Sequence, residues 1–548
     1  MITIIRPMML VLAITLLMLA AACRQTERPP FLPPPEPVPP PEMMWNVKTD
    51  YSNLTPYVPP FTMHTRLHDG PLPELIPSTD YGTLLPYASA AIMPDGGLRE
   101  SKFGFVTMDG VVVTDLVFDQ VNRAYEHIYH YSGLQPYPLP QAYWLTVNMP
   151  VSGQSYSESK QAACALDGSW ITPFDYVNIV FTRDVIMLMR SHDTYDVDVR
   201  DYSGRLLYNM LDMEWAGKLS GHSWPGELVY SVSEGYGSVQ LPDGTCAFID
   251  IRTGAARYTE YAMAHPFSEG FASVAINTGS FGPVQQLWGF IDSDFELVIP
   301  HMYVVPAMFK YGRAVVQFSD DTQHVIDKRG QTLFVVPSGA YMDHNYSGPG
   351  FVLYGYDREG YSNTFYTIDL QKINMPQIAL TAYSLEYLAN EWYGCNLPEG
   401  YLLFNQDREI FLPGVGNILL FDGEVMVYYE YTEDYGSQTG VRTLDGRDII
   451  PAKQEVTITA VTRNGALEAF VVNTHSGYSF GYGKDPEYRQ SGYWLVDTDG
   501  ELIVSGYGMM SHNEAEGLIS VLGADHFAWL DLEGNVIISI PHMSYMMD

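Results

Sequence analysis

Short apolar stretches separated by polar turns recur along most of this 548-residue chain. The stretch LWGFIDSDFELVIP, residues 287–300, is typical: an apolar run ends at Asp292, a polar turn follows, and a second apolar run begins. Alternation at this short spacing predicts two β-strands around a tight turn. Because such a hairpin cannot bury its apolar side alone, the pattern predicts an array in which neighbouring units cover one another.

The residue that ends the first strand of this pattern, called the anchor below, recurs at eleven positions. These anchors are Thr107, Ala165, Asp201, Asp250, Asp292, Asp327, Asp369, Asn405, Thr443, Asp497 and Asp531. Their mean spacing is about 42 residues, which is typical of stacked or circular repeats. Most anchors have a glycine three residues later, as a hairpin turn with one residue at positive φ requires. Phe295, Lys372 and Arg408 break this rule, so we expect longer or strained turns there.

Two further features recur around the anchors. Pro173, Pro300, Pro413 and Pro451 each follow an anchor by eight residues, where we expect them to end a strand. The run Trp288-Gly289-Phe290-Ile291-Asp292, together with FSEGFASV at 267–274, resembles the bacterial WG repeat, also called KWG. The resemblance extends over residues 100–541, with Phe103-Gly104 and Thr439-Gly440 in place of the Trp-Gly pair in two other units.

We therefore expect an all-β fold, a repeat array of short antiparallel β-units that resembles a β-propeller. About four to eight blades form one propeller ring, so eleven units suggest either two rings or an open array of units that are not whole blades. A change of composition near residues 337–351 suggests two repeat regions, 59–340 and 341–548. Leu385, Leu388, Ala389 and Trp392 have helical spacing, which predicts a short surface helix within TAYSLEYLANEWYG, residues 381–394.

The N-terminus predicts an address outside the cytoplasm. Arg6 precedes a mostly apolar run that ends in Ala20-Ala21-Ala22, so residues 1–22 are expected to form a signal peptide. The Cys23 that follows makes this segment similar to a bacterial lipoprotein signal, in which the cysteine carries the lipid. The alternative is an ordinary secretory signal with an incidental cysteine. Residues 23–58 include a proline-rich run that favours an extended stalk.

Charge and cysteine content narrow the set of partners. The net charge is -35, which repels nucleic acid and anionic lipid head groups and suits cationic or uncharged partners. Beyond Cys23 the chain has only Cys164, Cys246 and Cys395, so at most one internal disulfide can form and disulfides do not build the fold.

No motif predicts a catalytic residue, a metal ligand or a cofactor site. The run GYSFG, residues 477–481, matches a nucleophile-elbow pattern at Ser479 but lacks the helix that should follow. His64 and His68 are four residues apart but have no glutamate between them. Asp196, Asp198 and Asp201 resemble a calcium loop, but Arg200 and Leu207 occupy positions that should supply ligands.

Tyrosine is the unusual component, with 40 residues against 24 phenylalanines. Strands favour tyrosine, and binding surfaces do as well, because the side chain is large, rigid and amphipathic. Three clusters between anchors are the candidate ligand-binding residues: Tyr129, Tyr131 and Tyr137; Tyr428, Tyr429, Tyr431 and Tyr435; and Tyr478 and Tyr482.

These features predict a lipid-anchored protein of the cell envelope, outside the cytoplasm, that binds a protein, peptide or glycan as a scaffold. Its expected partners are the lipid bilayer through Cys23 and an unknown protein or glycan, with no nucleic acid. Two alternatives stay open at this stage: a propeller-type hydrolase with its site in a central channel, and a purely structural spacer. An enzyme is the less favoured class because no catalytic set is evident.

Overall fold

The computed structural model divides the chain into two units, Met1–Asn46 and Val47–Asp548. It describes residues 81–546 apart from gaps at 93–97, 115, 126–137, 151–156, 220–224, 280–284, 345–347, 358–359, 375, 377–384, 432–436, 455, 464–465, 475–491, 508, 514–515, 524–525 and 542–544. All described residues belong to the second unit, which is almost entirely β-structure. Among them, no helix is long and apolar enough to cross a membrane.

The described strands form eleven small sheets of three or four strands, called A to K in chain order after the first strand of each. In all but sheet A, consecutive strands pair antiparallel with their neighbours in sequence. Sheets A to C are formed by β1 (Leu84–Ile92), β2 (Leu98–Thr107) and β39 (Tyr545–Met546); by β3 (Gln120–Tyr125), β4 (Pro138–Pro150) and β5 (Ser157–Ala165); and by β6 (Asn178–Phe181), β7 (Ile186–Met189), β8 (Val197–Arg200) and β9 (Leu206–Asn209).

Sheets D to G continue in the same way. They are formed by β10 (Tyr236–Gln240), β11 (Cys246–Asp250) and β12 (Ala256–Tyr258); by β13 (Met263–Ala264), β14 (Phe271–Asn277), β15 (Gln286–Asp292) and β16 (Leu297–Tyr303); by β17 (Arg313–Gln317), β18 (Gln323–Asp327) and β19 (Thr332–Val335); and by β20 (Ala340–His344), β21 (Phe351–Asp357) and β22 (Gly360–Tyr366).

Sheets H to K have four strands each. They are formed by β23 (Leu385–Tyr387), β24 (Tyr393–Leu397), β25 (Gly400–Phe404) and β26 (Glu409–Pro413); by β27 (Val415–Phe421), β28 (Val425–Tyr431), β29 (Ser437–Thr443) and β30 (Asp448–Gln454); by β31 (Val456–Arg463), β32 (Ala466–Thr474), β33 (Gly492–Asp497) and β34 (Leu502–Tyr507); and by β35 (Met509–Asn513), β36 (Leu518–Leu522), β37 (His526–Leu530) and β38 (Val536–Pro541).

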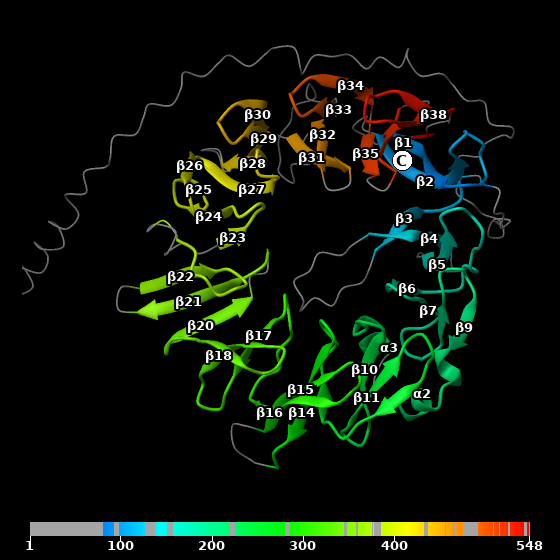
Figure 1. Ribbon diagram of the computed structural model, residues 1–548. Coiled ribbons are helices and arrows are strands. Elements are labelled where there is room, and N and C mark those ends of the chain that lie inside the picture. The colour runs from blue at the N-terminus through cyan, green and yellow to red at the C-terminus, as the bar shows by residue number, and fades with distance from the viewer. Residues whose placement is uncertain are drawn as a thin grey trace, which may run out of the picture. The chain divides into compact units, whose positions relative to one another are not determined.

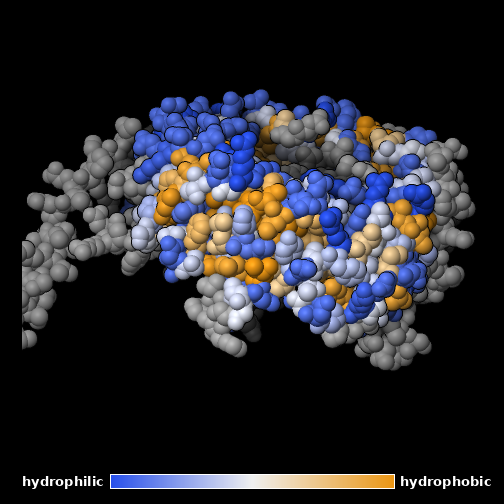
Figure 2. Space-filling view, turned by 60° about the horizontal axis from the view of Figure 1, so that its bottom comes forward, coloured by the Kyte–Doolittle hydropathy of each residue, from blue (hydrophilic) through white to orange (hydrophobic). Residues whose placement is uncertain are grey.

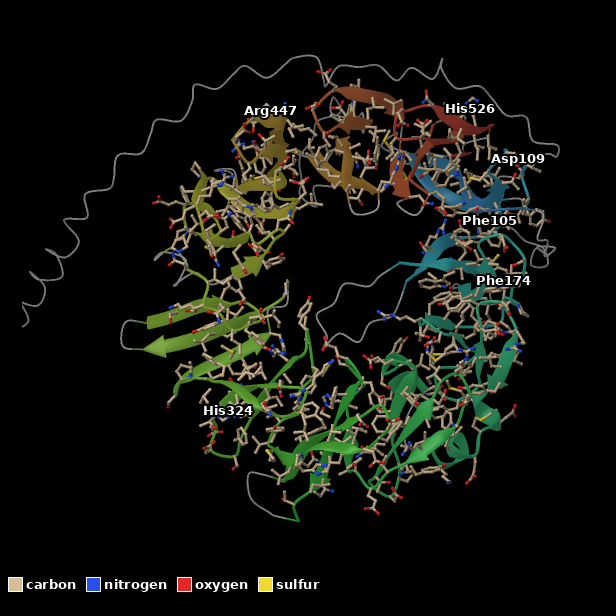
Figure 3. The ribbon with its side chains drawn as sticks, in the orientation of Figure 1. Phe105, Asp109, Phe174, His324, Arg447 and His526 are labelled. Atoms are coloured by element: carbon tan, nitrogen blue, oxygen red, sulfur yellow. The ribbon has the colours of Figure 1, made fainter. Side chains whose placement is uncertain are left out.

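Neighbouring sheets bury their apolar sides against each other, as the repeat pattern predicts. The cluster between sheets E and F, for example, joins Trp288 and Phe290 of β15 to Phe309 and to Ala314 of β17. Corresponding clusters fill the seams between D and E, H and I, and J and K. Between sheets A and B, Phe105 and Phe174 are joined through Phe118, at ring-centroid distances of 5.6 and 5.9 Å (Figure 3).

The succession of sheets closes on itself as a β-propeller (Figure 1). The last strand, β39, pairs in parallel with Ala91 and Ile92 of β1. The indole Nε1 of Trp529 in sheet K donates a hydrogen bond to the carbonyl oxygen of Pro86 in sheet A, at 2.9 Å. The sheets therefore form one ring, in place of the two rings or the open array that the number of units suggested.

Each sheet contains one of the predicted anchor turns. In the turn after β15, the amide of Phe295 donates to the carbonyl of Asp292 at 2.9 Å, and the Asp292 carboxylate accepts from the amides of Asp294 and Glu296 at 3.0 Å each. Thr443 does the same with its hydroxyl oxygen, which accepts from the Arg447 amide. Asp or Thr is thus suited to the anchor because its side chain satisfies the turn's own backbone donors. Figure 3 shows Asp109 and Arg447, which belong to two such turns, at the outer side of their sheets.

The predicted exceptions to the glycine rule have three different solutions. Phe295 takes the glycine position at φ 66°, which is strained for a residue with a side chain. In sheet G the turn begins at Thr367 rather than at Asp369, and Leu370 has the positive φ of 61°. In sheet H the turn is shorter, since the amide of Asn405 donates to the carbonyl of Arg408.

The glycine of the Trp-Gly pair and the following proline belong to one structural feature, a β-bulge. A Cβ atom on Gly289 would lie 2.5 Å from the carbonyl oxygen of Ile299, where β16 shifts register against β15. A Cβ atom on Gly440 would lie 2.9 Å from the backbone nitrogen of Ala452 in β30, beside Pro451. Pro300 and Pro451 therefore lie inside outer strands instead of ending them, and only Pro413 ends its strand. An outer strand tolerates proline because its missing N–H need not pair.

The predicted helix within residues 381–394 is wrong for the part that the structure describes. Leu385–Tyr387 and Tyr393–Leu397 are strands, and a tight turn joins them with Asn390 and Glu391 at φ 49° and 64°. The helical spacing arose because Leu388, Ala389 and Trp392 all pack into the seam between sheets H and I. The helices of the described residues, η2 (Met210–Asp212), α2 (Glu214–Leu219) and α3 (Pro225–Tyr230), lie in the seam between C and D.

Apolar side chains also reach the surface on the outermost strands of several sheets. These residues include Leu206, Leu297, Leu333, Leu502 and Ile537. On the face seen in Figure 2, apolar residues are interspersed with hydrophilic ones. Exposure of single apolar residues is normal for a folded protein. The division of the repeats at 340/341 stays a prediction, and β20 of sheet G begins there.

Candidate functional site

Strand β28 carries three of the candidate tyrosines and places them on two different sides of sheet I. Side chains alternate along a strand, so Tyr429 and Tyr431 share one side and Tyr428 takes the other. Tyr428 is only 1% exposed and packs in the apolar seam with sheet H. Tyr431 is 65% exposed at the end of the strand. Of these three, the pair Tyr429 and Tyr431 is the one that solvent reaches.

The two exposed tyrosines form a defined pair. Their ring centroids are 5.2 Å apart at an interplanar angle of 82°, which is an edge-to-face contact. Their hydroxyl oxygens are 3.1 Å apart and share a hydrogen bond. Aromatic pairs favour this geometry because the edge of one ring carries partial positive charge and the face of the other partial negative charge. We call these two residues the tyrosine pair.

Both rings of the tyrosine pair pack against Gly416 of the neighbouring strand β27. A Cβ atom on this glycine would lie 2.5 Å from a ring carbon of Tyr431 and 2.7 Å from one of Tyr429. Any other residue at 416 would push both rings away. No sequence pattern indicates this role, because the glycine lies outside any turn motif and its partners follow thirteen and fifteen residues later.

Glu386 of β23 supplies negative charge near the tyrosine pair. Its carboxylate accepts a short hydrogen bond from the Tyr401 hydroxyl, which fixes the carboxylate in place. The hydrogen bond with Tyr431 raises the pKa of Tyr429 to about 12, and burial and the negative charge of Glu386 act in the same direction. Tyr429 is therefore neutral near pH 7. Sequence reasoning missed Glu386 because it assigned residues 381–394 to a short surface helix, which gave no reason to place Glu386 near β28.

Tyr428 has a structural role on the opposite side of the sheet. The Arg442 guanidinium lies 4.9 Å from the centre of its ring and donates to the Asp448 carboxylate at 2.6 Å. Burial raises the pKa of Tyr428 well above its usual value. Burial likewise raises the pKa of the nearby Glu430. These groups tie β28, β29 and β30 together, and Tyr428 is closed off from a ligand in solution.

The remaining predicted site residues lie outside the described residues. These are Cys23, Tyr129, Tyr131, Tyr137, Tyr435, Tyr478 and Tyr482, and Ser479, His64 and His68 lie outside them as well. Their roles stay predictions.

The aspartates that resemble a calcium loop have other partners. Arg190 donates to Asp198 at 2.7 Å and to Asp196 at 3.0 Å, and Tyr176 and Asn209 also donate to Asp198. Burial alone would raise the pKa of Asp198, but these hydrogen bonds outweigh it and lower the pKa below its usual value. Asp201 is an anchor whose carboxylate holds its own turn. Across the described ranges, no group of three or more His, Cys, Asp or Glu side chains is placed to hold a metal ion.

The three cysteines of the repeat region are free thiols, so the one internal disulfide that the cysteine count allowed does not form. Cys164, Cys246 and Cys395 are all buried and none is paired. Burial raises the pKa of Cys246 to about 11 and that of Cys395 to about 12. Thiols in such surroundings stay protonated and unreactive, so they act as small apolar side chains.

Comparison with known proteins supports the repeat assignment and adds little beyond it. Residues 288–320 match the family model described as "WG containing repeat". No match was found among curated proteins. The matched segment begins in β15 of sheet E and ends after β17 of sheet F, so one sequence repeat spans parts of two sheets.

Solved structures with a similar arrangement of strands differ strongly in sequence. One is a eukaryotic initiation factor, at 7% identity and TM-score 0.36, covering 77% of this chain and 96% of that one. BamB from Moraxella catarrhalis matches at 11% sequence identity and a TM-score of 0.21, and the match covers 65% of this chain and 91% of that one. A post-proline cleaving enzyme from Rickettsia typhi matches at 11% sequence identity and a TM-score of 0.25, and the match covers 55% of this chain and 57% of that one. Likenesses at TM-scores this low carry no argument about function.

The Trp-Gly pair with its bulge, the anchor turns in each sheet and the family match at 288–320 lead to one assignment. The chain is a WG repeat-containing protein.

Proposed function

We propose that this chain is a lipid-anchored scaffold outside the cytoplasm that binds a protein, peptide or glycan through surface tyrosines. The observation that carries the proposal is the tyrosine pair, exposed and seated on Gly416. Tyrosines held in one geometry lose little conformational freedom on binding, which makes them effective contact residues. The surrounding ring of sheets supplies a rigid support.

The lipid anchor and the address rest on the sequence of residues 1–22 and on Cys23. Membrane attachment is tested by expressing the full chain in a bacterium supplied with a radioactive fatty acid. The wild-type chain is expected to take up the label and to sediment with membranes, and the Cys23→Ala variant to do neither. Label on the Cys23→Ala variant, or an unlabelled wild-type chain, would contradict the anchor.

Binding is tested by placing a photo-crosslinking amino acid at position 431 of the full chain. We expect a discrete crosslinked product in cell-envelope extracts, and we expect Gly416→Ala to weaken it, because that change displaces the tyrosine pair without removing it. Position 258 is the matched control, since Tyr258 is also exposed, at 47%. The same crosslinked products at both positions, or none at 431, would refute the proposal.

A further inference from the structure

The molecule covers many of its aromatic faces with its own cations. Among the described residues, eight Lys or Arg side chains lie over an aromatic ring, with 4.3 to 5.6 Å between the charge and the ring centre. Two of the exposed tyrosines belong to this set: Lys218 lies 4.5 Å from the ring centre of Tyr258, and Lys310 lies 5.6 Å from that of Tyr311. Attraction between a cation and the face of an aromatic ring explains the pattern.

The tyrosine pair departs from this pattern. Tyr431 is the most exposed of the large apolar and aromatic residues in the described part of the chain, at 65%. In that part, no Lys or Arg of this chain lies over Tyr431 or Tyr429. The charge of the Glu386 carboxylate, which acts on Tyr429, is negative. Arg442 of the same sheet is held on the opposite side by Tyr428 and Asp448.

We infer that the tyrosine pair with Glu386 receives an ammonium or guanidinium group of a basic peptide segment in the partner. This inference rests on the proposed binding function and names the chemistry of the partner. The ring of Tyr431 offers a face for the cation, Tyr429 fixes the orientation of that ring, and Glu386 supplies the opposite charge. The net charge of -35 favours the approach of such a segment from a distance.

The fit depends on three contacts that hold the tyrosine pair and Glu386 in place. Because Gly416 has no side chain, both rings can approach the backbone of β27 closely. The hydrogen bond between the two hydroxyl groups holds the edge-to-face geometry. The hydrogen bond from Tyr401 orients the Glu386 carboxylate, and among the described residues no basic side chain is bonded to it.

The test uses the full chain and a fluorescent peptide of alternating glycine and lysine, with its lysine-acetylated form as a neutral probe. Binding is followed by fluorescence anisotropy at two salt concentrations. We expect the lysine peptide to bind at least tenfold more tightly than the acetylated one. Tyr431→Ala should weaken binding by about threefold to tenfold, a range that the energy of an exposed cation–aromatic contact allows.

Three further variants separate this site from general attraction to an acidic protein. Tyr431→Phe keeps the ring and should retain most of the affinity. Glu386→Gln should weaken binding by about threefold and reduce its dependence on salt. Tyr258→Ala is the matched control and should bind like wild type, because Lys218 already occupies that ring. The thermal midpoint of each variant shows that it is folded.

Equal binding by wild type, Tyr431→Ala and Glu386→Gln would overturn the inference and assign the affinity to net charge. Equal binding of the lysine and acetylated peptides would also overturn it, in favour of a neutral ligand. If position 431 crosslinks a partner in envelope extracts while the lysine peptide does not bind, the proposed function stands and only the chemistry inferred here fails.

Discussion

Two arcs of the same ring are held together in different ways. In the arc of sheets D, E and F, residues 236–335, a glutamate in the turn of one sheet accepts a hydrogen bond from a glycine amide in the turn of the next. Glu234 accepts from Gly270 at 2.8 Å, and Glu269 accepts from Gly312 at 2.7 Å. We call these contacts the glutamate clasps.

The arc of sheets G, H and I, residues 340–454, has tyrosine rings packed on glycines, once between two sheets and twice within one sheet. Tyr387 of sheet H lies on Gly348 beside sheet G, Tyr401 lies on Gly394, and the tyrosine pair lies on Gly416. The first arc includes the segment that matches the WG repeat model, and the second does not. The comparison teaches that backbone contacts preserve a recognisable motif, while side-chain contacts allow a sheet of the same shape to diverge and to display aromatic residues.

The largest expected effect contrasts a glycine from each arc. A methyl group at Gly289 would meet the backbone of β16, which cannot move without breaking the bulge, so Gly289→Ala should cost about 3 kcal/mol. At Gly416 the methyl group meets only tyrosine rings, which can rotate away, so Gly416→Ala should cost about 1 kcal/mol. Urea unfolding followed by tryptophan fluorescence measures both.

Gly217→Ala is the control for that pair of variants. Its added methyl group meets nothing within 4 Å, and it lies in helix α2 at an ordinary φ, so the change should not destabilise the protein and should add up to about 1 kcal/mol through helix propensity. Equal losses for Gly289→Ala and Gly416→Ala would remove the distinction between the two arcs.

The seam between the arcs should make stability depend on pH. Burial and then the positive charge of Lys310 lower the pKa of His344 to about 4 from an ordinary value of 6.5. Between these two pKa values the unfolded chain binds a proton that the folded chain does not. The neutral His344 therefore makes its full contribution to the free energy of unfolding above pH 6.5, and this contribution is lost as the pH falls toward 4. Between pH 6.5 and pH 4, we expect the His344→Gln variant to lose about 2 kcal/mol less of its free energy of unfolding than the wild-type chain does.

Thermal unfolding between pH 4 and pH 7 measures the effect of His344. His192→Gln, a change at an exposed histidine of sheet C, is the control and should leave the pH profile as it is. A profile that is the same in wild type and His344→Gln would show that the seam does not exclude the charged imidazole.

A third variant asks why sheet E tolerates phenylalanine in its anchor turn. Phe295 packs against Tyr236, Phe248 and Phe267 of the seam with sheet D, at ring-centroid distances of 5.2 to 5.5 Å. Phe295→Ala loses these contacts and keeps the positive φ, so it should cost about 2 kcal/mol. Phe295→Gly loses the same contacts but relieves the strain, so it should cost about 1 kcal/mol less than Phe295→Ala. Differential scanning calorimetry of the two variants measures the difference, and the reverse order would show that the turn is not strained.

The smallest expected effect concerns a glutamate clasp. Glu269→Ala removes the acceptor of the Gly312 amide and should cost about 1 kcal/mol, whereas Glu269→Gln keeps a carbonyl acceptor and should cost less. Equilibrium unfolding in urea distinguishes them, with the exposed Glu227→Ala of α3 as a control. If Glu269→Gln is as damaging as Glu269→Ala, the ion pair with Lys328 is the important contact and not the clasp.

Much of the fold could be predicted because the anchor turn is local. Asp292 and Phe295 interact within five residues, so the pattern that places one turn in each sheet is visible in the sequence. The turn of sheet G was misplaced by two residues because Thr367 and Asp369 both carry an oxygen that can serve as the acceptor. The helix within 381–394 was mistaken because seam packing of a strand, turn and strand reproduces helical spacing.

The candidate site could be predicted only in part, since it depends on contacts between distant residues. The tyrosine-rich segment pointed to β28, but only the pleat of the strand separates Tyr428, which is buried, from Tyr431, which is exposed. Glu386 and Tyr429 are on different sheets, and nothing in the sequence connects them. Ring closure also depends on a contact between distant residues, because β1 and β39 lie at opposite ends of the described chain.

The offset between sequence repeat and sheet has a consequence for how such molecules grow. A copy of residues 288–320 inserted next to the original would start inside one sheet and finish inside the following one. The inserted copy would therefore pair with strands on both of its sides and would leave no unpaired sheet edge. Rings of this type can gain or lose members one at a time, and their size is a matter of duplication history rather than of a fixed geometry.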